Sequence, residues 1–426
     1  MLVLNKFNKY IPVLVFLISI FLVLRVSLES NYNIHPDEES HFTVVQFYKN
    51  HNYIPAVNDP ESDFTYNRVY GRSYINLLGF EYFFMGKFSN LMSFVHLEEY
   101  KIVRLFNFFL FLILGFLLYF NKEIKTLKYS LLLTPQLLYI ASYINNDFFA
   151  FFISLLVMIQ VISSKSYLNK FLKYGRLNYG LFLIFPFSLF LLIISKYNYI
   201  PLILAILLFL IYKYRKFKLR LILIFFIVFS LFGSRIYYDI LINGTNKTEL
   251  IELKANNLGS EGYRPMDFDI KSNKRAVSTH LRSKGIKLTE LFTIFHWHEL
   301  SYESFFGKYG YMTISSSQFT YNFYFLFSIL LLSILFYPLF IKFNIKNILI
   351  LVLALGLMLL MISFSIMHSW MNDFQPQGKY LFPIIGILFL SYHILKIHNK
   401  WSYLSLNLII CFTIYSYYIN CVLEVT

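Results

Sequence analysis

Three consecutive acidic residues flanked by histidines are the part of the sequence best suited to chemistry. They follow the first long apolar segment directly, in the stretch HPDEESH at 35–41. One of these carboxylates could act as a general base on an acceptor hydroxyl, while its neighbour orients that acceptor or a metal ion. His35 and His41 could also bind a divalent ion, although their spacing matches no standard zinc motif. The alternative is a solvated loop whose acids begin a helix.

A second acid lies in a short turn further along the chain. Asp147 ends the sequence Asn145-Asn146-Asp147, between two short apolar segments. Asn and Asp are ordinary residues at the start of a helix, which is the simplest explanation of this turn. The functional interpretation is a second carboxylate facing Asp37 across an outer vestibule.

Three basic residues lie next to the apolar segments, apart from the main basic clusters. They are Arg104, Lys196 and Lys379, the last within the sequence QGKY at 377–380. A cation beside a helix end could hold the phosphate of a lipid-linked ligand, with Gly378 allowing close approach of the backbone. The alternative is that these side chains extend to phospholipid headgroups.

Aromatic residues beside polar groups occur late in the chain, at 296–299 (HWHE) and at 305–312 (FFGKYGYM). Such stretches suit sugar stacking, but the membrane interface, where tyrosine and tryptophan are enriched, is the favoured explanation.

The composition is that of a membrane protein. Hydrophobic residues make up 57% of the 426 residues and charged residues 14%, against roughly a quarter in soluble proteins. We predict an all-α polytopic protein with eleven spans, the first an anchor and not a cleaved signal peptide. The expected spans are 10–28, 103–120, 129–144, 148–163, 177–195, 198–212, 221–242, 321–341, 347–367, 380–395 and 401–420.

Basic residues gather in alternate connections between these spans. Five connections and the N-terminal segment hold 18 of the 38 Lys and Arg residues but 1 of the 23 acids, Glu123. This bias places them in the cytoplasm, together with the N-terminus. The net charge of +15 is therefore a topology signal, and a nucleic-acid partner is not expected. Two long loops, 29–102 and 243–320, then lie outside with the candidate catalytic residues.

The segment 73–95 is apolar but contains Glu81 and Lys87. Counting it as a span would place the basic cluster near residue 125 outside and invert every later loop. We therefore predict an interfacial or re-entrant helix within the first external loop.

Taken in order, these motifs resemble the GT-C superfamily of integral-membrane glycosyltransferases, in particular the bacterial family called domain of unknown function 2142. The resemblance covers nearly the whole chain, as a single membrane domain over 1–426. Two positions depart from the family pattern: His35 stands where proline is usual, and Lys379 replaces arginine, which keeps the charge but loses the bidentate fork. The matching stretches are HPDEESHF at 35–42, TP at 134–135 with NND at 145–147, FFGKYGY at 305–311 and QGKYLFP at 377–383.

The resemblance implies transfer of a sugar from a polyprenyl-phosphate donor to a cell-envelope glycan, at the outer face of the bacterial cytoplasmic membrane. It implies Asp37 as the catalytic base, with Glu38 as its partner and Asp147 as a second acid. The residues expected to bind substrate or phosphate are Arg104, Lys196, Gln377, Lys379 and Tyr380.

Two other functions remain open from the sequence. The first is a transporter or flippase of a lipid-linked glycan, although the predicted spans carry few ionisable residues near the bilayer midplane. The second is a polysaccharide polymerase or ligase, which would use a lipid-pyrophosphate oligosaccharide.

Overall fold

The fold is a bundle of helices with almost no strand. The computed structural model describes residues 2–121, 123–124, 126–268, 278–341, 344–397 and 400–426. Within these residues, eight helical segments are long and apolar enough to cross a membrane, which indicates a multi-pass membrane protein. They are Tyr10–Glu29, Glu99–Phe120, Asp147–Tyr174, Tyr197–Tyr214, Lys218–Asn243, Gln318–Leu339, Ile345–Met371 and Lys400–Val425.

Helices occupy the predicted segments with one exception. Two shorter apolar segments, Gly180–Ser195 and Gly378–Ile394, match the predicted spans 177–195 and 380–395, and the count of eleven spans stays a prediction. The bundle helices are α1 (Leu2–Glu29), α4 (Glu99–Phe120), α6 (Asp147–Ile162), α8 (Ile184–Ser195), α9 (Ile200–Tyr214), α10 (Lys218–Asn243), α14 (Gln318–Ile341), α15 (Ile345–Met371), α16 (Pro383–Ile394) and α17 (Lys400–Tyr417).

The exception is the predicted span 129–144, which is not one helix. It is divided into the 3₁₀ helix η3 (Leu127–Leu132) and α5 (Pro135–Ile140). Thr134 is extended, with φ −135° and ψ 146°, and its side chain accepts from the Leu137 backbone N–H as the α5 cap. A residue before proline avoids the helical region, and Pro135 has no N–H to continue a helix from η3.

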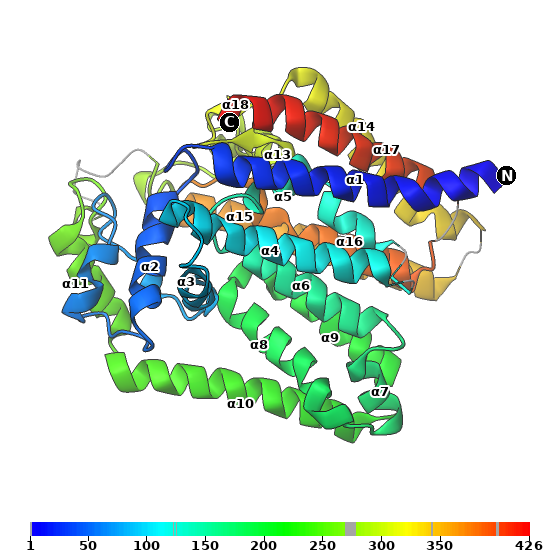
Figure 1. Cartoon of the computed structure of the whole chain (residues 1–426), viewed down its shortest axis with the longest axis horizontal. Helices are drawn as coiled ribbons and strands as arrows, with labels where there is room; N and C mark the ends of the chain where they lie inside the picture. The colour runs from blue at the N-terminus through cyan, green and yellow to red at the C-terminus, as the bar shows by residue number, and fades with distance from the viewer. Residues whose placement is uncertain (1, 122, 125, 269–277, 342–343, 398–399) are drawn as a thin grey trace.

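The two ends of the bundle differ. Figure 1 shows α2 (Glu38–Asn50), α3 (Glu81–Leu91) and α11 (Lys247–Leu258) at one end, the loop end, and the N-terminus and α7 (Tyr167–Tyr174) at the other, the basic end. The C-terminus lies towards the loop end. Successive bundle helices alternate in direction, so the two long connections meet at the loop end and the described parts of the basic connections at the basic end.

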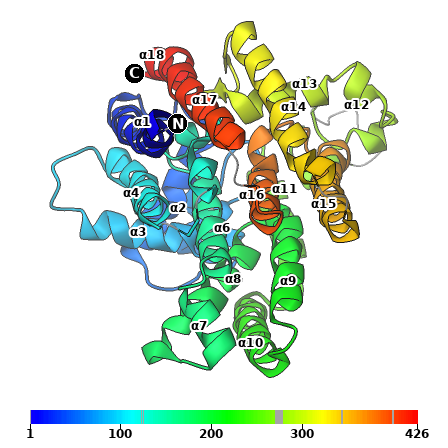
Figure 2. The ribbon, with the colours of Figure 1, turned by 90° about the vertical axis from the view of Figure 1, so that its right-hand side faces the viewer.

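The segment around α3 lies across the bundle. In Figure 1 α3 is viewed end-on while α1, α4 and α10 run lengthwise, and in Figure 2 this relation is reversed. With 11 residues, α3 is shorter than the roughly 20 needed to span a bilayer. It packs against α2, and the 3₁₀ helices η1 (Pro60–Thr65) and η2 (Tyr74–Asn76) complete the first loop.

The second long connection covers the loop end near α15 and α16. Its small apolar cluster consists of Leu281, Leu291 and Trp297, packed against Trp370 of α15. A two-residue hairpin follows, with Lys308 paired to Ser315 and Tyr309 to Ile314. The remaining elements are η6 (Pro265–Phe268), η7 (Arg282–Lys284), α12 (Glu290–Thr293), α13 (Trp297–Phe306), β1 (Lys308–Tyr309), β2 (Ile314–Ser315), η4 (Asn178–Leu183), η5 (Tyr197–Tyr199), η8 (Gly378–Leu381), the π-helix η9 (Tyr418–Val422) and α18 (Leu423–Val425).

Helix α6 lies at the centre of the bundle. Figure 2 shows it between α4, α8 and α16, and nearly all of its residues are buried. Its first residue is Asp147, so this carboxylate enters the middle of the loop end.

Candidate active site

Asp37 has an unusual backbone conformation. It precedes α2 in the left-handed region, with φ 57° and ψ 12°, and its side chain makes no cap hydrogen bond. This conformation costs a non-glycine residue roughly 1–2 kcal/mol, so the surrounding structure must hold it. The carboxylate is partly exposed, and the Tyr74 hydroxyl donates to its Oδ2 atom at 3.3 Å. Asp37 is therefore accessible and is not engaged in capping α2.

The His35 side chain fixes the backbone two residues before Asp37 through hydrogen bonds at both ring nitrogens. The imidazole is fully buried, with Nε2 2.9 Å from the Ser30 hydroxyl and Nδ1 2.8 Å from the Tyr139 hydroxyl. Burial, and then the charge of Arg104, lower the pKa of His35 well below its usual value, so the ring is neutral. Both ring nitrogens already have partners, which leaves neither for a metal ion.

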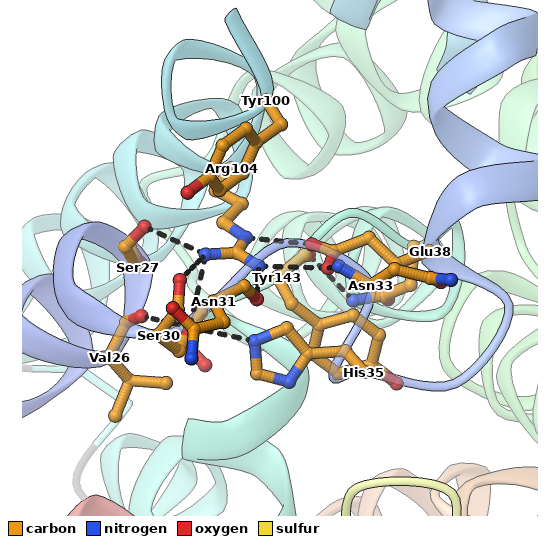
Figure 3. A network of polar contacts seen from close by, with 12 residues as sticks. Val26, Ser27, Ser30, Asn31, Asn33, His35, Glu38, Tyr100, Arg104 and Tyr143 are labelled. Atoms are coloured by element: carbon orange, nitrogen blue, oxygen red, sulfur yellow. Dashed lines mark hydrogen bonds and ion pairs between the residues drawn. The ribbon is translucent and has the colours of Figure 1, made fainter. Parts of the chain in front are cut away.

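Glu38 holds the chain on the other side of Asp37, through a fully buried ion pair with Arg104 (Figure 3). The pairing is bidentate: Arg104 Nε donates to Oε1 at 2.7 Å and Nη2 to Oε2 at 2.8 Å. The remaining N–H groups of Arg104 reach Ser27 and Ser30 at the end of α1 and the Asn31 carbonyl. This network joins α1, α2 and α4 directly beside Asp37.

Asp147 binds two lysines from distant parts of the chain. Its Oδ1 atom lies 2.8 Å from Lys196 Nζ, and its Oδ2 atom lies 3.2 Å from Lys379 Nζ. The three side chains are 6%, 20% and 12% exposed, respectively, so water screens the charges only weakly. Lys196 precedes η5 and Lys379 lies in η8. The structure thus brings together three of the residues selected from the sequence, with one positive charge in excess.

His41 and Tyr74 lie between Asp37 and this lysine cluster. Tyr74, which binds Asp37, stacks on the His41 ring at 4.3 Å, and His41 Nδ1 lies 2.7 Å from the Tyr82 hydroxyl. Burial first, then the charges of Lys379 and Lys196, lower the pKa of His41 to about 3. Asp37 is near enough to act electrostatically on Lys379. Asp37 and the lysine cluster therefore form one polar site.

The predicted metal role of the histidines finds no supporting cluster. His35 and His41 point to different tyrosines. Across the described parts of the chain, no group of three or more His, Cys, Asp and Glu residues could hold a metal ion.

The QGKY sequence packs tightly on the second loop. A Cβ atom on Gly378 would lie 2.1 Å from the Phe305 backbone nitrogen, and the Gly378 N–H donates to Ser304 Oγ. The glycine therefore permits contact between η8 and α13, where the sequence suggested close approach to a ligand. The Tyr380 hydroxyl donates to Gln375, whereas Gln377 Oε1 is buried without a partner.

The aromatic stretch after α13 covers the first loop. The Gly310 N–H donates to the Tyr139 hydroxyl at 2.9 Å, and the Tyr311 hydroxyl donates to Asn33 at 2.8 Å. Tyr309 is buried, whereas Tyr311 is exposed near Asp37. His296, His298 and Glu299, at the start of α13, are exposed and form only weak ion pairs with one another.

Sequence reasoning did not assign site roles to Tyr74, Tyr82 or Glu81. Glu81 is fully buried, and its Oε1 atom accepts from the Asn146 side chain at 3.2 Å, next to Asp147. An ionisable residue within an apolar segment is a functional signal in its own right, and Glu81 carried it. The tyrosines carried no such signal because the chain contains 35 of them.

No family model, curated protein or solved structure matches the chain.

Proposed function

We propose that this protein is an inverting glycosyltransferase that takes a sugar from a polyprenyl-phosphate donor and adds it to a cell-envelope glycan. It acts at the outer face of a bacterial cytoplasmic membrane, with the loop end outside. The basic connections at the opposite end support this orientation. The four motifs that resemble the GT-C superfamily support the reaction class.

Asp37 is the proposed general base. Its carboxylate is accessible and is not used for capping. It takes the proton of the acceptor hydroxyl as that oxygen attacks C1 of the donor sugar from the face opposite the phosphate. The bond between C1 and the phosphate oxygen breaks, and lipid phosphate leaves. The configuration at C1 is therefore inverted.

Lys196 and Lys379 are the proposed phosphate-binding groups. With Asp147 they carry one excess positive charge, which matches the single negative charge of a phosphodiester-linked sugar. As the bond to C1 breaks, negative charge develops on the leaving phosphate, and cations held in a weakly screened site stabilise it. Asp147 keeps the two ammonium groups together, whereas the unpaired Gln377 Oε1 is an acceptor and suits a sugar hydroxyl, not a phosphate oxygen.

Glu38 and Arg104 have a different proposed role from the one that the resemblance implies. All five N–H groups of Arg104 have protein partners, so a phosphate contact would require breaking a buried ion pair. We assign this pair, with His35, to holding Asp37 in its left-handed conformation.

An apolar groove lies further along the helices that begin at the two lysines, in the half of the bundle towards the basic end. It has a volume of about 260 Å³ and lies between α9, α15 and α16. Helix α9 begins after η5, next to Lys196, and α16 begins after η8, which contains Lys379. A polyprenyl chain in this groove would have to continue along α9 and α16 to place its phosphate at the two lysines.

The observation that carries the proposal is that Lys196 and Lys379 share Asp147, with Asp37 near enough to act electrostatically on Lys379. The test is transfer of a radiolabelled sugar from polyprenyl phosphate to envelope glycan by purified protein in detergent, without any gradient. Gradient-free formation of labelled glycan is expected. Movement of the lipid-linked glycan across vesicles without new glycosidic bonds would instead favour a flippase.

The same assay distinguishes the proposed glycosyltransferase from a polymerase or ligase, which would use a lipid-pyrophosphate donor. A lipid-pyrophosphate donor carries more negative charge than the lysine cluster compensates. Transfer from the monophosphate donor should therefore be faster, and a preference for the pyrophosphate donor would contradict the proposed function.

A further inference from the structure

A large groove lies at the basic end, far along the bundle from Asp37. Its volume is about 820 Å³, and it is formed by the last turns of α4, the end of α6 and the connection to α7. Small-molecule sites commonly have volumes of roughly 300–1,000 Å³, so the groove can accept a substantial part of a lipid.

One wall of the groove is apolar and open. Ile113, Phe116 and Phe120 lie on one face of α4, and the two phenylalanines are 63% and 73% exposed. Their rings stack with centroids 4.7 Å apart. Such a wall suits an acyl chain lying along the helix.

The other rim of the groove is polar. Lys165 is exposed at the end of α6, and Gln160 Oε1 is buried with no hydrogen-bond partner. Asn121 lies opposite them at the end of α4. The groove therefore offers polar groups where the helices reach the membrane surface, beside a long apolar wall.

Glu123 is the single acid among the residues that line the groove, and its carboxylate is already hydrogen-bonded within the protein. The carboxylate accepts from Ser163 Oγ at 2.7 Å, Ser164 Oγ at 2.8 Å and the Lys165 backbone N–H at 3.3 Å. Burial opposes ionisation, but these hydrogen bonds outweigh it and lower the pKa of Glu123. Glu123 thus organises the turn that presents Lys165.

We propose that this groove binds an anionic phospholipid, with one acyl chain against Phe116 and Phe120 and the headgroup phosphate at Lys165. The charge of the predicted cytoplasmic segments favours such a lipid, because these connections and the N-terminal segment hold 18 of the 38 basic residues but 1 of the 23 acids. Basic sites between helices at the cytoplasmic surface commonly take anionic headgroups. The site is independent of the glycosyltransferase reaction.

The test is native mass spectrometry of the full-length protein titrated with phosphatidylglycerol or phosphatidylcholine. Wild type should retain phosphatidylglycerol preferentially. Lys165→Glu should weaken its binding at least fivefold, as expected from about 1 kcal/mol per basic residue. The matched control is Lys216→Glu, an exposed basic-end lysine outside the groove, which should bind as wild type does.

A second variant tests the apolar wall. Ile113→Trp fills the groove without changing charge, and retention of phosphatidylglycerol should fall while the melting temperature stays near that of wild type. Equal loss of binding in Lys165→Glu and Lys216→Glu, or equal retention of both lipids by wild type, would show only annular lipid and overturn the proposal.

Discussion

At the scale of single residues, the site depends on which charges are compensated. The charges of Arg104 and Glu38 neutralise each other, whereas Lys196 and Lys379 share one carboxylate. Two cations with one counter-ion can accept a phosphate at little cost. A fully paired arginine cannot do so without leaving a buried charge unpaired.

Lys196→Gln and Lys379→Gln should each lower transfer about 100-fold, because each removes a group that stabilises the leaving phosphate. Lys379→Arg should retain much of the activity, since it keeps the charge. The measurement is the initial rate of sugar transfer. Lys308→Gln is the control, because Lys308 binds Glu303 outside the cluster. Equal rates for wild type and Lys379→Gln would remove Lys379 from the mechanism.

The neutral histidine His41 predicts a pH effect on stability. In the unfolded chain histidine has a pKa near 6.5, whereas in the fold burial and the nearby lysines lower the pKa of His41 to about 3. Between these values the unfolded chain binds a proton that the folded chain does not. The free energy of unfolding should therefore fall below about pH 6.5, by up to roughly 1.4 kcal/mol per pH unit.

Melting temperatures in detergent between about pH 7.5 and pH 5 check this prediction. His41→Asn should reduce the dependence and leave the part that the buried, neutral His35 contributes, whereas a variant of the exposed His298 should not change it. An unchanged slope in His41→Asn would contradict the assignment.

At the scale of elements, the buried ion pair fastens three helices together beside Asp37. Arg104→Met would leave the Glu38 carboxylate buried without a counter-ion and should cost about 3–5 kcal/mol. The control is Arg25→Met, because the pair between Arg25 and Glu29 is exposed and should matter by less than about 1 kcal/mol. Chemical or thermal unfolding measures both, and similar losses for the two variants would contradict the network.

The contact between η8 and α13 can be tested in the same way. Gly378→Ala places a methyl group against the Phe305 backbone and should cost about 1–3 kcal/mol while displacing Lys379. Gly356→Ala is the control, because nothing lies within 4 Å of its added Cβ. It should be neutral or slightly stabilising in a helix. A wild-type melting temperature for Gly378→Ala would show that the close approach is unimportant.

The positions of most helices could be predicted from the apolar runs in the sequence. The break within one of these runs and the pairing of charged residues could not. By hydropathy, residues 129–144 are one predicted span, but Pro135 divides them, because the residue before a proline avoids the helical region. The prediction gave more weight to the length of the apolar run than to this local rule. In the sequence, Arg104 is a cation near a helix end. Its contact with Glu38, 66 residues away, arises only in the folded structure. Pairings of this kind depend on packing that no local pattern encodes.

At the scale of the whole molecule, the uneven distribution of basic residues distinguishes the two ends of the bundle. The basic connections and the polar site lie at opposite ends of the bundle, as alternate crossing requires. The sequence predicted this separation because basic residues bias topology before any packing occurs. It also predicted Asp147, Lys196 and Lys379 as members of the site, but not that one carboxylate would bind both lysines.

The orientation can be measured by cysteine labelling in cells, with Cys411 and Cys421 replaced. Ser40→Cys, in the first loop, should react with an impermeant maleimide applied from outside. Ser164→Cys, in the connection after α6, should react only after the membrane is permeabilised. The opposite result would invert the topology and remove the outer-face reaction.

The most direct test of the central claim is the transfer rate of purified Asp37→Asn beside Glu39→Gln, its exposed neighbour. Loss of a general base should lower the rate by about 100- to 10,000-fold in Asp37→Asn, while Glu39→Gln stays near wild type. Wild-type transfer by folded Asp37→Asn would contradict the account.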